Sequence, residues 1–186
     1  MLIILVILGL LFAYGAVLYN NLVALRENVK KNWANIDVLL KQRHDELPKL
    51  VETCKQYMGY EQETLRQVME ARTRVSQAQQ SGSVDELGKA ESQLRLGLGN
   101  LFAVAEQYPD LKANESFQHL QKRITGLEES IADRREFYNE SVNLNNIRIA
   151  QFPDMIIANL FNFEDAELLE FTEEEISDVS MKALFE

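Results

Sequence analysis

The chain begins with an uninterrupted run of apolar side chains. No charged side chain follows this run until Arg26. Seventeen helical residues at about 1.5 Å each span about 25 Å, close to the thickness of a bilayer core, and residues 19–23 can lengthen the helix. The pattern therefore predicts a transmembrane anchor over residues 1–23. The apolar run consists of Leu2, Ile3, Ile4, Leu5, Val6, Ile7, Leu8, Gly9, Leu10, Leu11, Phe12, Ala13, Tyr14, Gly15, Ala16, Val17 and Leu18.

Two other interpretations of this run compete with the anchor. Residues 13–15 form a passable cleavage site of small residues, which would suit a signal peptide. However, a basic region before the run is missing, and the run exceeds the usual signal-peptide core of about 7 to 15 residues. A buried core helix is the second competitor, but such helices seldom begin a chain with an unbroken apolar run. The anchor is therefore favoured, and membrane lipid is its expected partner.

Beyond the anchor, apolar residues recur every three or four positions as far as Val75. This spacing predicts one long amphipathic helix, or two helices in line, with a kink at Pro48. Gly82 ends this element, and Ser83 with Glu86 matches the capping box of a second helix.

Two further apolar stripes complete the bundle. The second stripe runs from Leu87 to Tyr108, and the third from Phe117 to Ile149. Few turn-forming residues interrupt them, because the 186 residues include 8 glycines and 3 prolines. We therefore predict an all-α fold: an N-terminal transmembrane helix that continues into an elongated antiparallel bundle of three long helices plus a short C-terminal helix. The bundle is expected over residues 24–163.

The predicted helix lengths leave one stripe without a partner. An unbroken first helix reaching Gln80 would extend about 90 Å, whereas the second helix would return only about 38 Å. The membrane-proximal stripe would then be uncovered, and large apolar stripes are not normally left in water. We predict that parallel copies pack against it, with a sharp fold at Pro48 as the alternative. The stripe consists of Leu22, Leu25, Val29, Trp33, Ile36 and Leu40.

Negative charge is concentrated at the C-terminal end. The whole chain carries a formal charge of −10, and residues 164–186 contain nine acidic side chains against the single Lys182. This balance argues against a nucleic-acid partner, which requires clustered basic residues. Just before this acidic tail, the segment FPDMIIANLFNF at residues 152–163 predicts a short apolar helix, either a bundle cap or a contact with another molecule. The tail is either disordered or a docking segment.

Candidate chemistry is sparse. His44 and His119 lack partners at metal-binding spacing, and Cys54 lies on an apolar stripe. Neither a glycine-rich phosphate loop nor a nucleophile elbow occurs. The sequence therefore predicts no metal, no cofactor and no enzymatic activity. Helical geometry also directs several polar residues toward the seams, where they form either a ligand pocket or buried pairs that fix helix register. These residues are Asp37, Arg43, Glu106, Glu128, Arg135 and Asn139.

The stretch YPDLKANESF, residues 108–117, is predicted to be a corner between the last two stripes. Pro109 disfavours helical geometry at Tyr108, and Asn114 is a good N-cap for the next helix. The corner side chains also form a candidate surface for a neighbouring molecule. They are Tyr108, Asp110, Lys112 and Asn114.

Three segments of the chain read WANIDVLLKQRHDELPKLV, LFAVAEQYPDLKANESFQHLQ and RREFYNESVNLNNIRIAQFP. They resemble, in the same order, the signature blocks of the LemA family of bacterial membrane-anchored helical proteins. The sequence departs from the family pattern at Glu46 and Lys49, beside Pro48, and at Asn145–Asn146. The resemblance implies an anchored helical bundle without an established enzymatic activity.

Taken together, these features predict a non-catalytic single-pass protein of the bacterial cell (inner) membrane. The basic residues Arg26, Lys30 and Lys31 follow the anchor, so the positive-inside rule places the N-terminus outside and the helical region in the cytoplasm. The expected function is a self-associating homo-oligomeric scaffold that organises or remodels the membrane. The alternative is a tethered adaptor that binds an unidentified protein through its C-terminal apolar helix and acidic tail.

Overall fold

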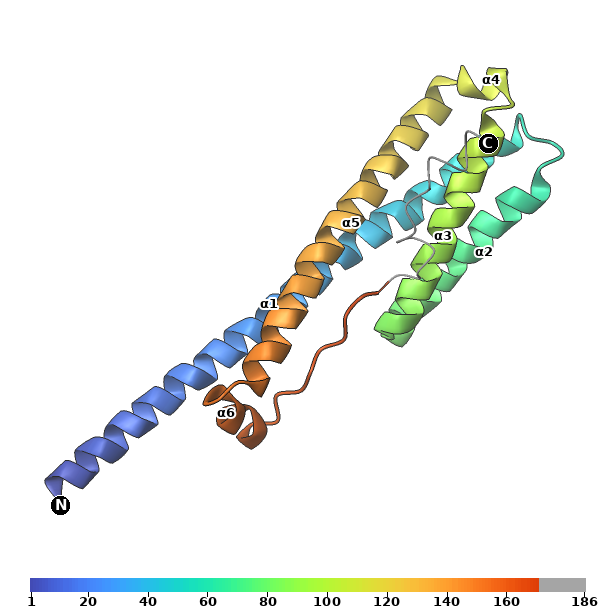
Figure 1. Cartoon of the computed structure of the whole chain (residues 1–186). Coiled ribbons are helices and arrows are strands. Elements are labelled where there is room, and N and C mark those ends of the chain that lie inside the picture. The colour runs from blue at the N-terminus through green and yellow to red at the C-terminus, as the bar shows by residue number, and fades with distance from the viewer. Residues whose placement is uncertain (171–186) are drawn as a thin grey trace, which may run out of the picture. The chain divides into compact units, whose positions relative to one another are not determined.

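A computed structural model describes residues 1–170, and Figure 1 shows that the chain is built from helices joined by short connections. The described residues contain no strand, which confirms the predicted all-α class. The helices are α1 (Leu2–Lys55), α2 (Gln62–Ser81), α3 (Val84–Ala105), α4 (Pro109–Lys112), α5 (Glu115–Ala150) and α6 (Asp154–Leu160).

The long first element differs from its prediction. Helix α1 continues through Pro48 and ends at Lys55, and α2 begins only after the loop of residues 56–61. In Figure 1, α2 runs back alongside the end of α1. The predicted helices in line, and the alternative fold at Pro48, are therefore wrong. The apolar spacing concealed this turn because Met58, inside the loop, is buried like the helical residues on either side.

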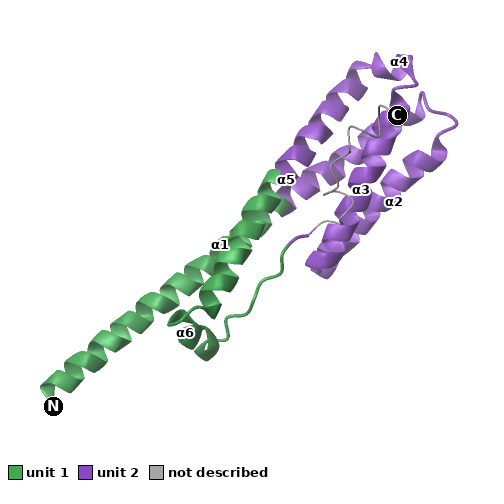
Figure 2. Ribbon diagram, in the orientation of Figure 1, with its two compact units in different colours: residues 1–36, 133–168 green, residues 37–132, 169–186 purple. Residues whose placement is uncertain are grey.

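The chain divides into two compact units, coloured separately in Figure 2. Unit 1 consists of residues 1–36 and 133–168. Unit 2 consists of residues 37–132 and the segment that starts at Leu169. Each unit thus combines stretches that are far apart in the sequence.

In unit 2, helices α2 and α3 form a tight antiparallel hairpin. Gly82 ends α2 with a left-handed φ of 73°, a conformation that glycine adopts without a steric penalty. Ser83 then caps α3, because its hydroxyl oxygen accepts a hydrogen bond from the Glu86 amide at 3.2 Å. The predicted start of this helix is therefore confirmed.

The YPDLKANESF corner also lies in unit 2. It contains the short helix α4 between α3 and α5, with Tyr108 at the N-cap of α4 and Pro109 as its first residue. The side-chain oxygen of Asn114 accepts a hydrogen bond from the Phe117 amide at 3.0 Å and caps α5. The predicted corner and its cap are confirmed. Asp110 and Lys112 are exposed, whereas Tyr108 and Asn114 are half-buried.

In unit 1, the N-terminal part of α1 lies against the C-terminal part of α5. The rings of Trp33 and Tyr138 are 5.1 Å apart, and the Asn32 side chain donates a hydrogen bond to the Phe137 carbonyl at 3.3 Å. Helix α6 follows α5 after a short turn and lies beside α1 (Figure 1). This arrangement supplies an intrachain neighbour for residues that the sequence left uncovered.

Candidate functional site

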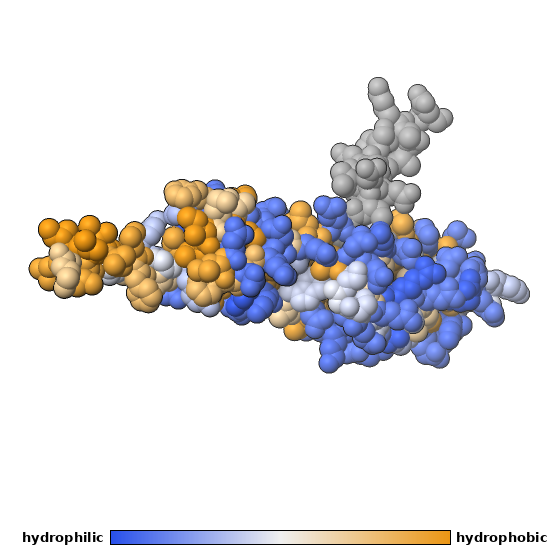
Figure 3. Space-filling view, turned by 90° about the horizontal axis from the view of Figure 1, so that it is seen from below, coloured by the Kyte–Doolittle hydropathy of each residue, from blue (hydrophilic) through white to orange (hydrophobic). Residues whose placement is uncertain are grey.

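The apolar segment of α1 is the first component of the candidate site. Its side chains are largely exposed along the whole segment. The exposed fraction is 79% for Leu2, 82% for Phe12 and 55% for Val17. Within the described residues, α1 is the helix that is long and apolar enough to cross a membrane. Figure 3 shows this hydrophobic surface. Exposure of so many apolar side chains is unfavourable in water, whereas lipid solvates them.

Two phenylalanine rings pack on Tyr19 of α1, where the apolar segment ends. The Tyr19 ring lies 4.8 Å from the Phe161 ring and 5.8 Å from the Phe163 ring. The Arg26 guanidinium lies over the Phe163 ring, 5.2 Å from its centre. Aromatic rings and long basic side chains together are typical of the boundary between a membrane and water.

Helix α6 contacts the same region of α1. A Cβ atom placed on Gly15 would lie 3.9 Å from Cδ1 of Ile157, an ordinary van der Waals distance. The charged residue of α6, Asp154, is buried and accepts a hydrogen bond from Arg148 Nε at 2.9 Å. The ion pair neutralises this carboxylate, so the exposed part of α6 is uncharged.

The predicted self-association stripe is mostly covered by its own chain. Leu22, Ile36 and Leu40 are at most 2% exposed. Leu25, Val29 and Trp33 are half-buried. The expectation that this stripe has no intrachain partner is therefore wrong for the three buried leucine and isoleucine positions. It failed because the turn after Lys55 shortens the first helix and allows α5 to return along it.

The segment after α6 is held along α5 in unit 1. The Tyr138 hydroxyl donates to the Glu167 carbonyl at 2.8 Å. The Asn146 side chain donates to the Ala166 carbonyl and accepts from the Ala166 amide, both at 2.9 Å. Burial, and then the nearby Glu167 carboxylate, raise the pKa of Tyr138. The beginning of the acidic tail is therefore ordered, whereas its residues 171–186 lie outside the described part of the chain.

Unit 2 contains an ion-pair triad in which Arg43 and Glu91 are buried and Glu128 is 21% exposed. Arg43, 1% exposed, donates to Glu91 at 2.5 Å and to Glu128 at 2.6 Å. Burial disfavours the charged guanidinium, but the two carboxylates outweigh that cost and raise the pKa of Arg43. Sequence reasoning identified Arg43 and Glu128 but missed Glu91. The triad joins α1, α3 and α5, which favours the interpretation that these polar residues fix helix register.

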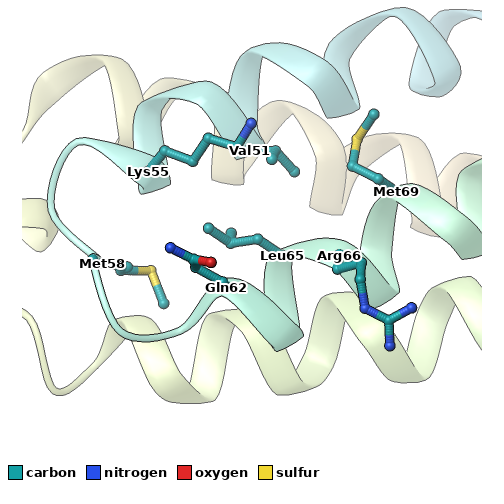
Figure 4. A pocket seen from close by; sticks show the side chains of 8 residues that line it. Val51, Lys55, Met58, Gln62, Leu65, Arg66 and Met69 are labelled. Atoms are coloured by element: carbon teal, nitrogen blue, oxygen red, sulfur yellow. The ribbon is translucent and has the colours of Figure 1, made fainter.

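The other polar residues at the seams are dispersed. Asp37 accepts a hydrogen bond from Gln79 at 2.9 Å on the surface, and Glu106 forms an exposed ion pair with Lys112. None of them lines the cavity of about 500 Å³ between the end of α1 and the start of α2. Figure 4 shows the side chains that line this cavity. The apolar ones include Met58 and Leu65, and the polar ones are Lys55, Gln62 and Arg66.

Burial has the largest effect on the pKa values of Cys54 and His44. Burial raises the pKa of the Cys54 thiol to about 12, which suppresses its nucleophilic thiolate form. Burial, and then the charge of Arg72, lower the pKa of His44. Residues 1–170 contain no group of three side chains placed to hold a metal ion.

The fold and these contacts define a class: a membrane-associated helical protein with one candidate transmembrane helix and a helical bundle. Comparison with known families is consistent with this class, because the model of the LemA family matches residues 32–182. The chain belongs to the LemA family.

Individual relatives are more distant. Magnetosome protein MamQ 2 of Paramagnetospirillum magneticum is 25% identical over 80% of this chain and 63% of its own length. Magnetosome protein MamQ of Magnetospirillum gryphiswaldense is 23% identical over the same shares. Protein LemA of Metamycoplasma hominis is 26% identical over 89% of this chain and 74% of its own length. The chain thus spans slightly less than two thirds of the length of the magnetosome relatives.

Proposed function

We propose that this chain is a non-catalytic, single-pass protein of the bacterial inner membrane that self-associates into a homo-oligomeric scaffold. The apolar segment of α1 supports the anchor, and family membership supports a bacterial membrane setting. Arg26, Lys30 and Lys31 favour a cytoplasmic location for the helical region. Reporter fusions to the C-terminus that are active only in the cytoplasm test this orientation; activity of a periplasmic reporter there would contradict it.

The observation that carries self-association is an apolar patch on α5 in unit 1. Phe137, Leu144 and Ile147 are 52%, 50% and 54% exposed. At 100° per residue they fall within about 80° of one another around the helix, with Glu140 between them. Because anchors that insert in the same direction place this patch at the same height in every copy, copies can bury it against one another. This patch replaces the Leu22–Leu40 stripe as the proposed interface.

The test is the mass of the full-length protein in mild detergent. We expect a defined oligomer, and we expect smaller species when Phe137, Leu144 and Ile147 are all changed to Ser. A matched control changes Val38, Tyr60 and Leu96 to Ser, since these are also large, exposed apolar residues but lie in unit 2. The control should keep the native mass. A native protein that is monomeric, or a control that dissociates equally, would contradict the proposed interface.

An adaptor is the second candidate. Its support is the net charge of −8 over residues 164–186, where nine acidic side chains face one lysine, together with the exposed apolar side chains of α6. Deletion of residues 171–186 should then remove one co-purifying protein and leave the oligomeric mass unchanged. Loss of the oligomer on this deletion, with no partner lost, would instead place the tail in the contact between copies.

A further inference from the structure

We infer that α6 and its flanking residues form a second membrane-contacting element, an interfacial helix that lies in one leaflet beside the anchor without crossing it. This inference rests on the proposed insertion of α1. The occupant of the exposed α6 surface is the lipid bilayer, and continuity with the lipid-facing surface of the anchor identifies it.

The contacts of α6 fix its depth relative to the anchor. The Ile157 side chain lies beside Gly15 of α1, within 4 Å of where a Cβ on that residue would be, and the Phe161 ring packs on Tyr19. Tyr19 directly precedes Asn20 and Asn21, the first amide side chains along α1. Gly15 lies four residues earlier, about 6 Å deeper along the helix axis. Helices that lie in the membrane interface bury their apolar face about 5–10 Å deep. The level of α6 therefore matches an interfacial helix.

The exposed chemistry of this element suits lipid. The large apolar side chains around α6 are exposed by 78% at Phe152, 56% at Ile156, 68% at Leu160 and 53% at Phe161. Figure 3 shows hydrophobic surface gathered here, next to the surface of the anchor. From residue 149 to residue 163 the only charge is Asp154, which is buried against Arg148. Insertion of this segment thus brings no unpaired charge into the lipid.

The aromatic contacts add a second indication of the boundary. Phe161 and Phe163 pack on Tyr19, and Arg26 reaches over Phe163. An arginine at this position keeps its charge in the headgroup layer while its stem and the rings lie deeper. Because α6 contacts the anchor on one side of the bilayer, its apolar volume enters a single leaflet. Each copy then adds a wedge to that leaflet.

Depth-dependent quenching tests the inference on the full-length protein in vesicles of phosphatidylcholine and phosphatidylglycerol. In a Cys54→Ala background, single cysteines are introduced as Ile156→Cys or Leu160→Cys and labelled with the fluorophore NBD. Phe12→Cys reports the anchor, and Gln118→Cys reports an exposed position of α5 in unit 2. The quenchers are lipids with a doxyl group near the headgroup or near the end of the acyl chain, and aqueous iodide.

We expect loss of fluorescence at positions 156 and 160 with the shallow doxyl lipid, and a smaller loss with the deep one. Position 118 should respond to iodide alone. If position 12 is quenched by lipid but positions 156 and 160 respond only to iodide, the inference is overturned and the anchor stands. If positions 156 and 160 are shielded from all three quenchers, protein covers α6 and the inference is again overturned. If position 12 is not quenched by lipid, the proposed anchor fails as well. Circular dichroism verifies that each variant remains helical.

Discussion

Removal of the Arg43 guanidinium should strongly destabilise unit 2. Arg43→Ala leaves Glu91, 4% exposed, and Glu128 without the cation that now lies 2.5 and 2.6 Å from them. Breaking a buried ion pair by removing one partner costs about 3–5 kcal/mol, because the remaining charge stays desolvated. At about 2–4 °C per kcal/mol for a chain of this size, the expected decrease in Tm is about 6–20 °C.

The structure provides a matched control for this change. Arg66 also pairs with two carboxylates, those of Glu63 and Glu70, but all three side chains are about half exposed. Arg66→Ala should therefore leave Tm nearly unchanged, since water screens and solvates exposed pairs. The combined variant with Arg43→Met, Glu91→Met and Glu128→Gln removes the three charges together and puts an apolar side chain at the buried position 91, so it should recover most of the stability lost in Arg43→Ala.

The assay is thermal unfolding of the full-length protein in mild detergent, followed by far-UV circular dichroism. Because the two units need not unfold together, the exposure of the Cys54 thiol serves as a local probe of unit 2. Equal decreases in Tm for Arg43→Ala and Arg66→Ala would refute the reasoning. So would a triple variant that is no more stable than Arg43→Ala, because the cost would then not come from unpaired charge.

Two further predictions concern unit 2. Cys54 should not react with a thiol reagent at pH 8 until the protein unfolds, because burial raises its pKa from 9.0 to about 12 and lowers the thiolate fraction about a thousandfold; rapid labelling of the folded protein would contradict this. Gly88→Ala should displace the start of the tail from α3 and lower Tm, because a Cβ there would lie 2.1 Å from the Glu170 carbonyl oxygen. Gly99→Ala, on the same helix with open space around it, should instead stabilise α3 by about 1 kcal/mol. Equal effects of the two glycine substitutions, measured by circular dichroism, would rule out the tail contact.

Local chemistry made part of the fold predictable. The cap at Ser83, the left-handed Gly82 and the cap at Asn114 depend on neighbours within a few residues, so their sequence signals were sufficient. The corner at Pro109 was predictable for the same reason. Contacts between distant segments of the chain were harder to predict, because they leave weaker signals in the sequence. Gly88, a glycine inside a helix, was the available hint that another backbone approaches α3 there.

The turn at residues 56–61 shows why periodicity alone misplaced an element. Cys54, Met58 and Leu65 continue the apolar spacing through the loop, and all three are buried, so the loop resembled a helix in the pattern. Gly59 was the single local signal for a break. This one turn decided whether the first helix continued for another 25 residues or stopped and reversed.

The sequence by itself determined the helical class, the apolar anchor segment and the local helix caps, because these depend on composition and on spacing along the chain. The tertiary structure decided which faces remain exposed. Leu22 and Ile36 are buried only in the folded chain, and only the position of α6 places Phe161 against Tyr19. The pairing of Arg43 with Glu91 was likewise visible only in the tertiary structure. Such contacts join residues dozens of positions apart, and their energy depends on the packed geometry that no local pattern specifies.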